Sequence, residues 1–197
     1  MGYRIVVIGT SLGGLRALSA LLEALPADLA LPLAIVQHRA PGSSGLAEFL
    51  QRSSALRVVE VEDKQPIVAG RAYLAPPDYH TLVSGARFAL STDAPVRHAR
   101  PSIDVLFESA AADYGPAAVG VILTGASDDG AAGLASIRRR GGLGLVQDPS
   151  DAACAVMPRA ALAGGADRVL PLAALAPALC ELASANTSPL QRCEGRS

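Results

Sequence analysis

The sequence predicts an α/β fold, a doubly wound and mostly parallel sheet with helices on both faces. Short apolar runs rich in β-branched residues alternate along the chain with segments whose apolar residues recur every three or four positions. Continuous apolar runs are typical of strands that are covered on both faces, as parallel strands are. The length of 197 residues suits one such domain, and the 4% aromatic content indicates a core of small aliphatic side chains.

The first quarter of the chain shows this alternation clearly. We expect a buried strand at residues 4–8, a helix from the following Gly-rich turn to Pro26, and a second buried strand at 33–36. A turn at 41–44 then leads to a helix ending near Gln51, for which Ser43 or Ser44 is the expected N-cap.

From residue 56 to 91 the pattern changes to short alternating segments, which favours a small β-hairpin excursion. The expected strands of this excursion are 57–61, 71–75, 81–84 and 88–90, with turns at 76–78 and 84–85.

Beyond residue 100 the strand–helix alternation returns. Ser102 lies near the expected start of a helix, and Asp128 and Asp129 precede another. We predict a single domain over residues 1–184 and a disordered tail over 185–197. The expected elements are a helix at 101–112, a strand at 117–123, a helix at 130–140, a strand at 144–147, a helix at 157–162, a strand at 167–170 and a helix at 172–183.

Composition excludes several classes of function. A net charge of −1 gives no electrostatic reason to expect nucleic acid or an anionic membrane as a partner. Two local clusters, 97–100 and 138–140, are either solvated surface or a docking patch for an acidic partner, and the sequence alone leaves this open. No apolar run approaches the ~18 residues of a membrane helix, so we expect a protein without membrane insertion, located in the cytoplasm.

Chemistry-bearing residues follow three of the predicted strands. In open α/β sheets functional groups gather beyond the carboxyl ends of the strands. Ser11 follows the first strand, His38 the second, and Asp128 and Asp129 a later one. Hydroxyl, imidazole and carboxylate are the groups that a serine hydrolase needs, because a serine hydroxyl requires a base to become nucleophilic. By pattern alone, Ser11 is also compatible with an ordinary turn or cap residue, and either aspartate with a helix cap.

A dinucleotide-binding turn is the main rival for residues 9–14. Gly9 and Gly14 occupy the outer positions of that fingerprint, but Ser11 stands where the middle glycine admits the pyrophosphate. The second strand also ends in Gln37-His38 rather than in the acidic residue that would hold the ribose. Both departures count against nucleotide binding.

Seven segments in order resemble the catalytic domain of CheB, the protein-glutamate methylesterase of bacterial chemotaxis. They span residues from about 4 to 180, and their combined order is far more specific than any single motif. The segments are 8–14 (IGTSLGG), 36–38 (VQH), 72–80 (AYLAPPDYH), 100–104 (RPSID), 123–130 (LTGASDDG), 146–148 (VQD) and 157–158 (MP).

The resemblance implies a Ser–His–Asp triad of Ser11, His38 and Asp129, with Asp128 left as a possible cap. It implies hydrolysis of glutamate methyl esters on chemoreceptor cytoplasmic helices, releasing methanol, and deamidation of certain glutamines. No cofactor or metal is implied. Proteins of the signalling complex are further candidate partners. The expected oxyanion donors are backbone amides near Leu12, Gly13 and Ala126.

The chain also departs from the family pattern. Leu12 stands where Thr is frequent, and Ala126-Ser127 replaces the usual Met-Gly, so the substrate fit next to the triad is open. The few residues before the expected first strand leave no room for the receiver domain that usually precedes this domain, and we expect a stand-alone enzyme rather than an excised domain. The alternative functions are a catalytically silent module that binds receptors or signalling proteins, and a hydrolase of other small esters.

Overall fold

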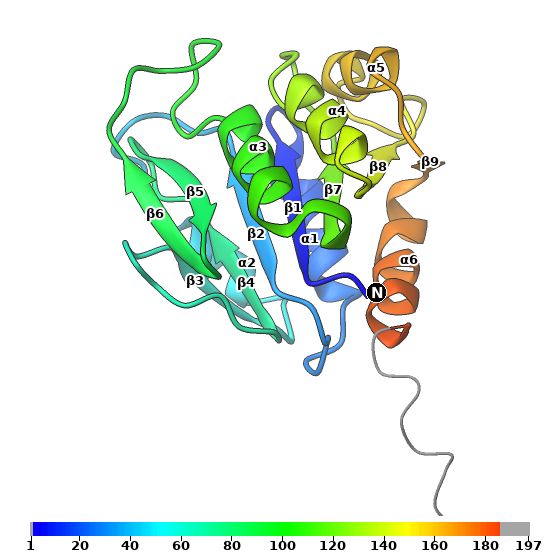
Figure 1. Cartoon of the computed structure of the whole chain (residues 1–197), viewed down its shortest axis with the longest axis horizontal. Coiled ribbons are helices and arrows are strands. Elements are labelled where there is room, and N and C mark those ends of the chain that lie inside the picture. The colour runs from blue at the N-terminus through cyan, green and yellow to red at the C-terminus, as the bar shows by residue number, and fades with distance from the viewer. Residues whose placement is uncertain (1, 186–197) are drawn as a thin grey trace, which may run out of the picture.

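A seven-stranded parallel sheet forms the centre of the molecule (Figure 1). The computed structural model describes residues 2–185. Its strand order is β3-β4-β2-β1-β7-β8-β9, and every adjacent pair is parallel. The strands are β1 (Ile5–Thr10), β2 (Leu33–Gln37), β3 (Arg57–Glu60), β4 (Arg71–Leu74), β7 (Ala118–Ile122), β8 (Leu143–Gln147) and β9 (Arg168–Leu170).

Helices cover both faces of this sheet. One apolar cluster joins the sheet to α1 (Gly14–Glu23), α2 (Leu46–Gln51) and α6 (Leu172–Ser184). A second cluster joins the other face to α3 (Ile103–Tyr114), α4 (Ala131–Arg139) and α5 (Val156–Ala163). In Figure 1, α3 and α4 lie in front of the sheet and α1 behind it. The predicted doubly wound α/β fold is therefore confirmed.

The β-hairpin is smaller than the sequence suggested. It consists of β5 (His80–Ser84) and β6 (Arg87–Ser91), which pair antiparallel and pack against α3. The expected strands at 57–61 and 71–75 instead form β3 and β4, which extend the main sheet at one edge. Because β3 is exposed at the sheet edge, its alternating pattern looked like that of a hairpin strand.

Two expected helix caps are wrong. The residue before α2 is Gly45, with a left-handed φ of 81°, so neither Ser43 nor Ser44 caps that helix. Gly130, with a φ of 97°, takes the same position before α4, and Asp128 does not cap it. A glycine reaches this backbone conformation without the steric cost that a Cβ would add. The predicted tail lies outside the described residues, except for Ala185.

The centre of the sheet is also the point where its winding reverses. From β1 the chain moves outward to β2 on one side, and after the hairpin it returns to β7 on the other. The helix after β1 packs on one face, whereas the helix after β7 packs on the opposite face. Such a reversal leaves a crevice at the carboxyl ends of the two strands, where ligands bind in open α/β folds.

Candidate functional site

Strand register brings the three predicted residues to one edge of the sheet. Thr10 is paired with Gln37, so that Ser11 and His38 each follow the last paired residue of neighbouring strands. The backbone N–H of His38 donates to Thr10 O at 3.0 Å, and that of Ser11 donates to Thr124 O at 3.0 Å. The loop that carries Thr124 continues to Asp129, and thus the three segments converge at the switch point.

The turn that carries Ser11 is formed by close backbone packing. Gly13 has a φ of 82°, and a Cβ added to it would lie 2.6 Å from Ala153 Cβ. A Cβ on Gly14 would overlap Gln37 Oε1 and Thr10 Oγ1. The Gly14 N–H donates to Ser11 O at 2.9 Å, which closes the turn before α1 begins. Packing around this turn therefore requires both glycines.

Asp129 is completely buried, and its carboxylate accepts four hydrogen bonds. Oδ2 accepts from His38 Nε2 at 2.7 Å and from the Ile103 N–H at 2.7 Å. Oδ1 accepts from Ser102 Oγ at 2.9 Å and from the Asp104 N–H at 3.0 Å. Burial alone would raise the pKa of Asp129, but the hydrogen bonds from His38, Asp104 and Ile103 outweigh it and hold the pKa below its usual value.

The contact with Asp129 determines what the His38 ring can do. A carboxylate below its usual pKa is an acceptor, so His38 Nε2 carries the proton that is shared with Asp129. In the neutral ring this leaves Nδ1 as the proton acceptor. The His38 side chain is 17% exposed, which gives the ring access to a bound substrate. The hydroxyl of Ser11 makes no hydrogen bond to another described residue.

The amides expected to stabilise an oxyanion are available. The N–H groups of Leu12, Gly13 and Ala126 donate to no acceptor within residues 2–185. Leu12 and Ala126 are exposed, and Gly13 is partly buried. Thr124 Oγ1 donates to Leu12 O at 2.8 Å and accepts from the Cys154 N–H at 2.8 Å, which fixes the orientation of this turn.

Sequence reasoning missed part of the surroundings of Asp129. Ser102 stands at the N-cap position of α3, but its hydroxyl donates to Asp129 and accepts no N–H of the helix. Asp128, expected as a cap, pairs with Arg97 instead. Arg97 also donates through Nε to Asp104 Oδ2 at 3.0 Å, so this arginine of the cluster 97–100 is an ion-pair partner rather than a free surface charge. Of these residues only Ser102 and Asp104 lie in the segment RPSID, which could have indicated their roles.

His80, the last residue of the segment 72–80, makes hydrogen bonds to the backbone through its imidazole. It is 2% exposed, accepts the Ser102 N–H on Nδ1 at 3.2 Å, and donates from Nε2 to Ala94 O at 3.1 Å. Both ring nitrogens are thus occupied. The imidazole holds the two ends of the segment that leads from β6 to α3.

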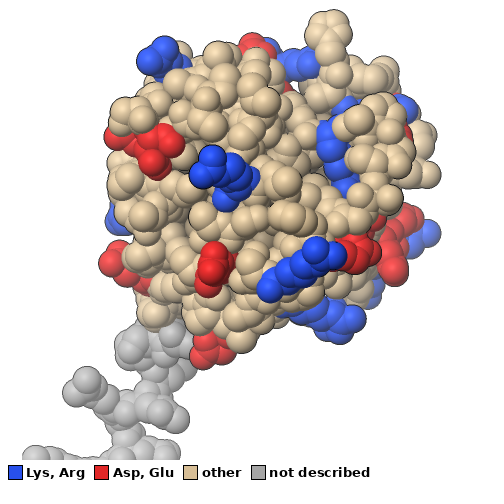
Figure 2. All heavy atoms as spheres, turned by 180° about the vertical axis from the view of Figure 1, so that it is seen from behind, with Lys and Arg blue, Asp and Glu red and all other residues tan. Residues whose placement is uncertain are grey.

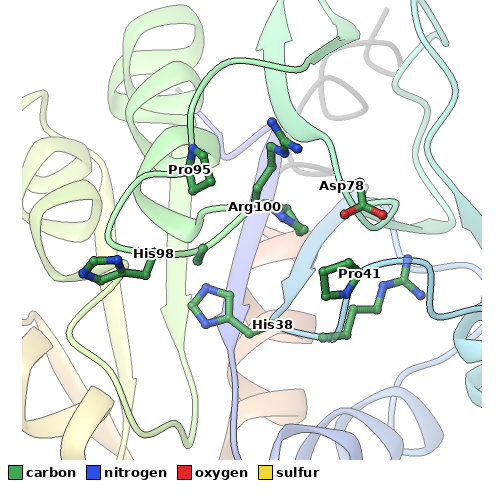
Figure 3. A pocket seen from close by; sticks show the side chains of 9 residues that line it. His38, Pro41, Asp78, Pro95, His98 and Arg100 are labelled. Atoms are coloured by element: carbon green, nitrogen blue, oxygen red, sulfur yellow. The ribbon is translucent and has the colours of Figure 1, made fainter.

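A cleft of about 250 Å³ opens beside His38 (Figure 3). The segment between β6 and α3 arches over it and contributes Pro95, His98 and Arg100, whereas Pro41 and Asp78 line the opposite side. Within the described part of the chain, no three His, Cys, Asp or Glu side chains gather as a metal-binding set.

Comparison with known proteins identifies the family. A family model described as CheB methylesterase matches residues 6–179. The chain belongs to the CheB methylesterase family. In line with this, the crystal structure of the Thermotoga maritima CheB methylesterase catalytic domain matches it with a TM-score of 0.87 and 34% identity, covering 92% of this chain and 100% of that chain.

Curated relatives in the CheB methylesterase family differ in length. The chain is 44% identical to a Leptospira interrogans protein provisionally named protein-glutamate methylesterase/protein-glutamine glutaminase, and covers 93% of it. It is 47% identical to protein-glutamate methylesterase/protein-glutamine glutaminase 2 of Anaeromyxobacter dehalogenans, and 41% identical to protein-glutamate methylesterase FrzG of Myxococcus xanthus. The chain spans only 53% and 54% of these two relatives, respectively.

Two surface properties bear on partners. Acidic and basic side chains are interspersed over the face shown in Figure 2, and neither sign forms a concentrated patch there. Among the helices within residues 2–185, none combines the length and apolar character needed to cross a bilayer.

Proposed function

We propose that this chain hydrolyses glutamate methyl esters on the cytoplasmic helices of methyl-accepting chemoreceptors, with Ser11 as nucleophile, His38 as base and Asp129 as orienting carboxylate. The observation that carries the proposal is the 2.7 Å hydrogen bond between His38 Nε2 and the buried Asp129, next to the turn of Ser11, in a member of the CheB methylesterase family. The relatives named protein-glutamate methylesterase/protein-glutamine glutaminase supply the substrate class.

The first half of the reaction forms an acyl-enzyme. Ser11 Oγ attacks the ester carbonyl carbon while His38 Nδ1 takes the hydroxyl proton. The carbonyl oxygen becomes an oxyanion, for which the free amides of Leu12, Gly13 and Ala126 are the proposed donors. Asp129 stabilises the imidazolium through Nε2. The tetrahedral intermediate then expels the methoxy group, which leaves as methanol with the proton from His38.

The second half restores the enzyme. His38 takes a proton from a water molecule, which attacks the glutamyl ester of Ser11, and the imidazolium returns that proton to the Ser11 oxygen as the bond breaks. The products are a free glutamate side chain and the regenerated hydroxyl. With a glutamine side chain the same steps release ammonia, which is the proposed deamidase activity.

The substrate also determines where the chain would act. Receptor methylation helices lie in the cytoplasm, so the proposal places the chain there, as the catalytic domain formed by residues 1–184. Other proteins of the signalling complex are further proposed partners.

The decisive experiment measures methanol release from methylated chemoreceptor by the wild-type chain and by Ser11→Ala. We expect the variant to fold normally and to lose turnover. Wild-type turnover in Ser11→Ala would refute the proposed nucleophile. Absence of methanol release from the wild type, together with Ser11-dependent hydrolysis of p-nitrophenyl acetate, would indicate a hydrolase of other esters. Absence of both activities and of fluorophosphonate labelling would indicate a silent binding module.

A further inference from the structure

Two buried carboxylates make reciprocal hydrogen bonds at the junction of α3 and α4. Asp129, just before α4, accepts the N–H groups of Ile103 and Asp104 in the first turn of α3. Asp104, in that first turn, accepts the N–H groups of Gly130 at 2.9 Å and Gly133 at 2.7 Å at the start of α4. The Asp129 carboxylate therefore binds N–H groups at the start of α3, and the Asp104 carboxylate binds N–H groups at the start of α4.

The bond to Gly130 fixes the backbone directly after Asp129. Gly130 has a φ of 97°, and a Cβ there would lie 2.6 Å from Ile103 Cγ2, so this peptide is packed tightly against α3. Its N–H donates to Asp104 Oδ1 and to no other described acceptor. Loss of that acceptor would leave a buried donor unpaired one residue away from the carboxylate that binds His38.

Arg97 completes the arrangement from the outside. Asp104 is 4% exposed, and burial raises the pKa of its carboxyl group above the usual value, although the Gly133 N–H and the Arg97 charge oppose this. Arg97 Nε donates to Asp104 Oδ2, and Arg97 Nη1 pairs with Asp128. One partly exposed guanidinium thus bridges the carboxylates on both sides of the α3–α4 junction.

We propose that Asp104 is a positioning residue for Asp129 and His38, an inference that rests on the proposed function. Asp104 does not line the cleft, and its carboxylate contacts neither His38 nor Ser11. It acts through the backbone of Gly130, which holds Asp129 where its Oδ2 meets His38 Nε2. Asp104 contributes a correctly positioned acceptor oxygen for these N–H groups, and its negative charge is not needed near the reacting atoms.

Two substitutions distinguish the position of the Asp104 acceptor oxygen from the charge of its carboxylate. Asp104→Asn keeps an acceptor oxygen for Gly130 and Gly133 but removes the charge, and we expect kcat within about 5-fold of the wild type for p-nitrophenyl acetate. Asp104→Glu keeps the charge but moves the oxygens by one methylene, and we expect kcat to fall about 10- to 100-fold, since small misplacements near a reacting group cost this much. KM should change less than 2-fold in both, because neither change touches the cleft.

A double-mutant cycle tests the route through Asp129. In the Asp129→Ala background, Asp104→Glu should cause no further loss of kcat, because the group that it positions is gone. Asp167→Ala is the matched control. Asp167 also binds an arginine and a glycine N–H, those of Arg138 and Gly144, but it lies at the amino edge of the sheet. That variant should lower Tm and leave kcat unchanged.

Three outcomes would overturn the inference while the proposed function stands. These are an Asp104→Glu enzyme with wild-type kcat, an Asn variant as impaired as the Glu variant, and equal losses with and without Asp129. Circular dichroism below Tm shows that each variant is folded when its kcat is measured. If Ser11→Ala hydrolyses p-nitrophenyl acetate as fast as the wild type, the proposed function fails first and the inference falls with it.

Discussion

Gln37 Nε2 donates to the carbonyl oxygen of Ser11 at 3.0 Å, and the same amide donates to His38 O at 2.8 Å. The last residue of β2 therefore holds the two turns that carry the proposed nucleophile and base. Gln37 is 8% exposed, so these bonds are shielded from competing water. Gln37 thereby links the backbones of the two turns.

Gly14→Ala should disturb that link. The new Cβ would overlap Gln37 Oε1 and Thr10 Oγ1, and displacement of Gln37 would release both turns. We expect a stability loss of about 1–3 kcal/mol, as for other overpacked sites, and a kcat reduction of about 10-fold. Urea unfolding and p-nitrophenyl acetate kinetics measure the two effects.

Gly164→Ala serves as the control for that substitution. Gly164 follows α5 with a φ of −79°, and a Cβ there would meet its nearest neighbour, Ala161 O, at 3.5 Å. This variant should keep wild-type kcat. Equal kcat values for the Gly14 and Gly164 variants would show that Gln37 does not control the site geometry.

Thr124→Val should impair the amides proposed for the oxyanion. Valine has nearly the same shape but loses the hydroxyl that donates to Leu12 O and accepts the Cys154 N–H. The partly buried Cys154 N–H and the Leu12 carbonyl then lose their hydrogen-bond partner, which costs about 1 kcal/mol of stability, and the Leu12–Gly13 turn loses its anchor. We expect kcat to fall about 10-fold with KM unchanged, because an oxyanion contact acts only in the transition state.

Thr124→Ser tests this explanation. Serine retains the hydroxyl, so it should restore kcat to within about 2-fold of the wild type while losing one methyl group of packing, worth about 1 kcal/mol. A serine variant as slow as the valine variant would attribute the effect to packing and not to the hydroxyl.

The fold and the strand-end residues were predictable from sequence because they depend on local pattern. Residues 5–8 of β1 and 33–36 of β2 are apolar and buried on both faces, so the ends of these strands, and with them Ser11 and His38, could be located. The pairing of Thr10 with Gln37 is a property of the assembled sheet, and no local pattern shows it.

The surroundings of Asp129 were not predictable, because they depend on contacts between distant segments and not on local pattern. Ser102 and Asp128 each have the side chain of a good N-cap, and local propensity alone assigns them to that role. In the structure Gly130 takes the cap position of α4, Asp128 turns to Arg97, and Ser102 turns to Asp129. These partners are about 30 residues apart in the sequence, and capping rules describe only residues within a few positions of a helix end.

Asp129→Asn should reduce turnover far more than it reduces folding. An asparagine can place an N–H toward His38 Nε2, which favours the wrong tautomer and removes the proton acceptor from Nδ1. By analogy with other Ser–His–Asp hydrolases we expect kcat to fall about 10³- to 10⁴-fold. The check is single-turnover kinetics with p-nitrophenyl acetate. A loss below 10-fold would show that His38 keeps its tautomer without the carboxylate.

The two buried carboxylates should give opposite pH dependences of stability. The pKa of Asp129 is lowered in the folded chain, so the stability it provides is present above the unfolded value of about 3.9 and is lost as the pH falls through the folded value. The pKa of Asp104 is raised, so its contribution is present below about 3.9 and is lost as the pH rises through the folded value.

Urea unfolding of the wild type, Asp129→Asn and Asp104→Asn at several pH values between 3 and 7 tests this contrast. The free energy of unfolding of the wild type minus that of Asp129→Asn should grow with rising pH, because only the wild type gains from ionising a carboxylate that accepts four hydrogen bonds. The corresponding difference for Asp104→Asn should shrink over the same range, since ionised Asp104 is penalised by its burial. Slopes of the same sign would mean that the Arg97 bridge, rather than burial, dominates at Asp104.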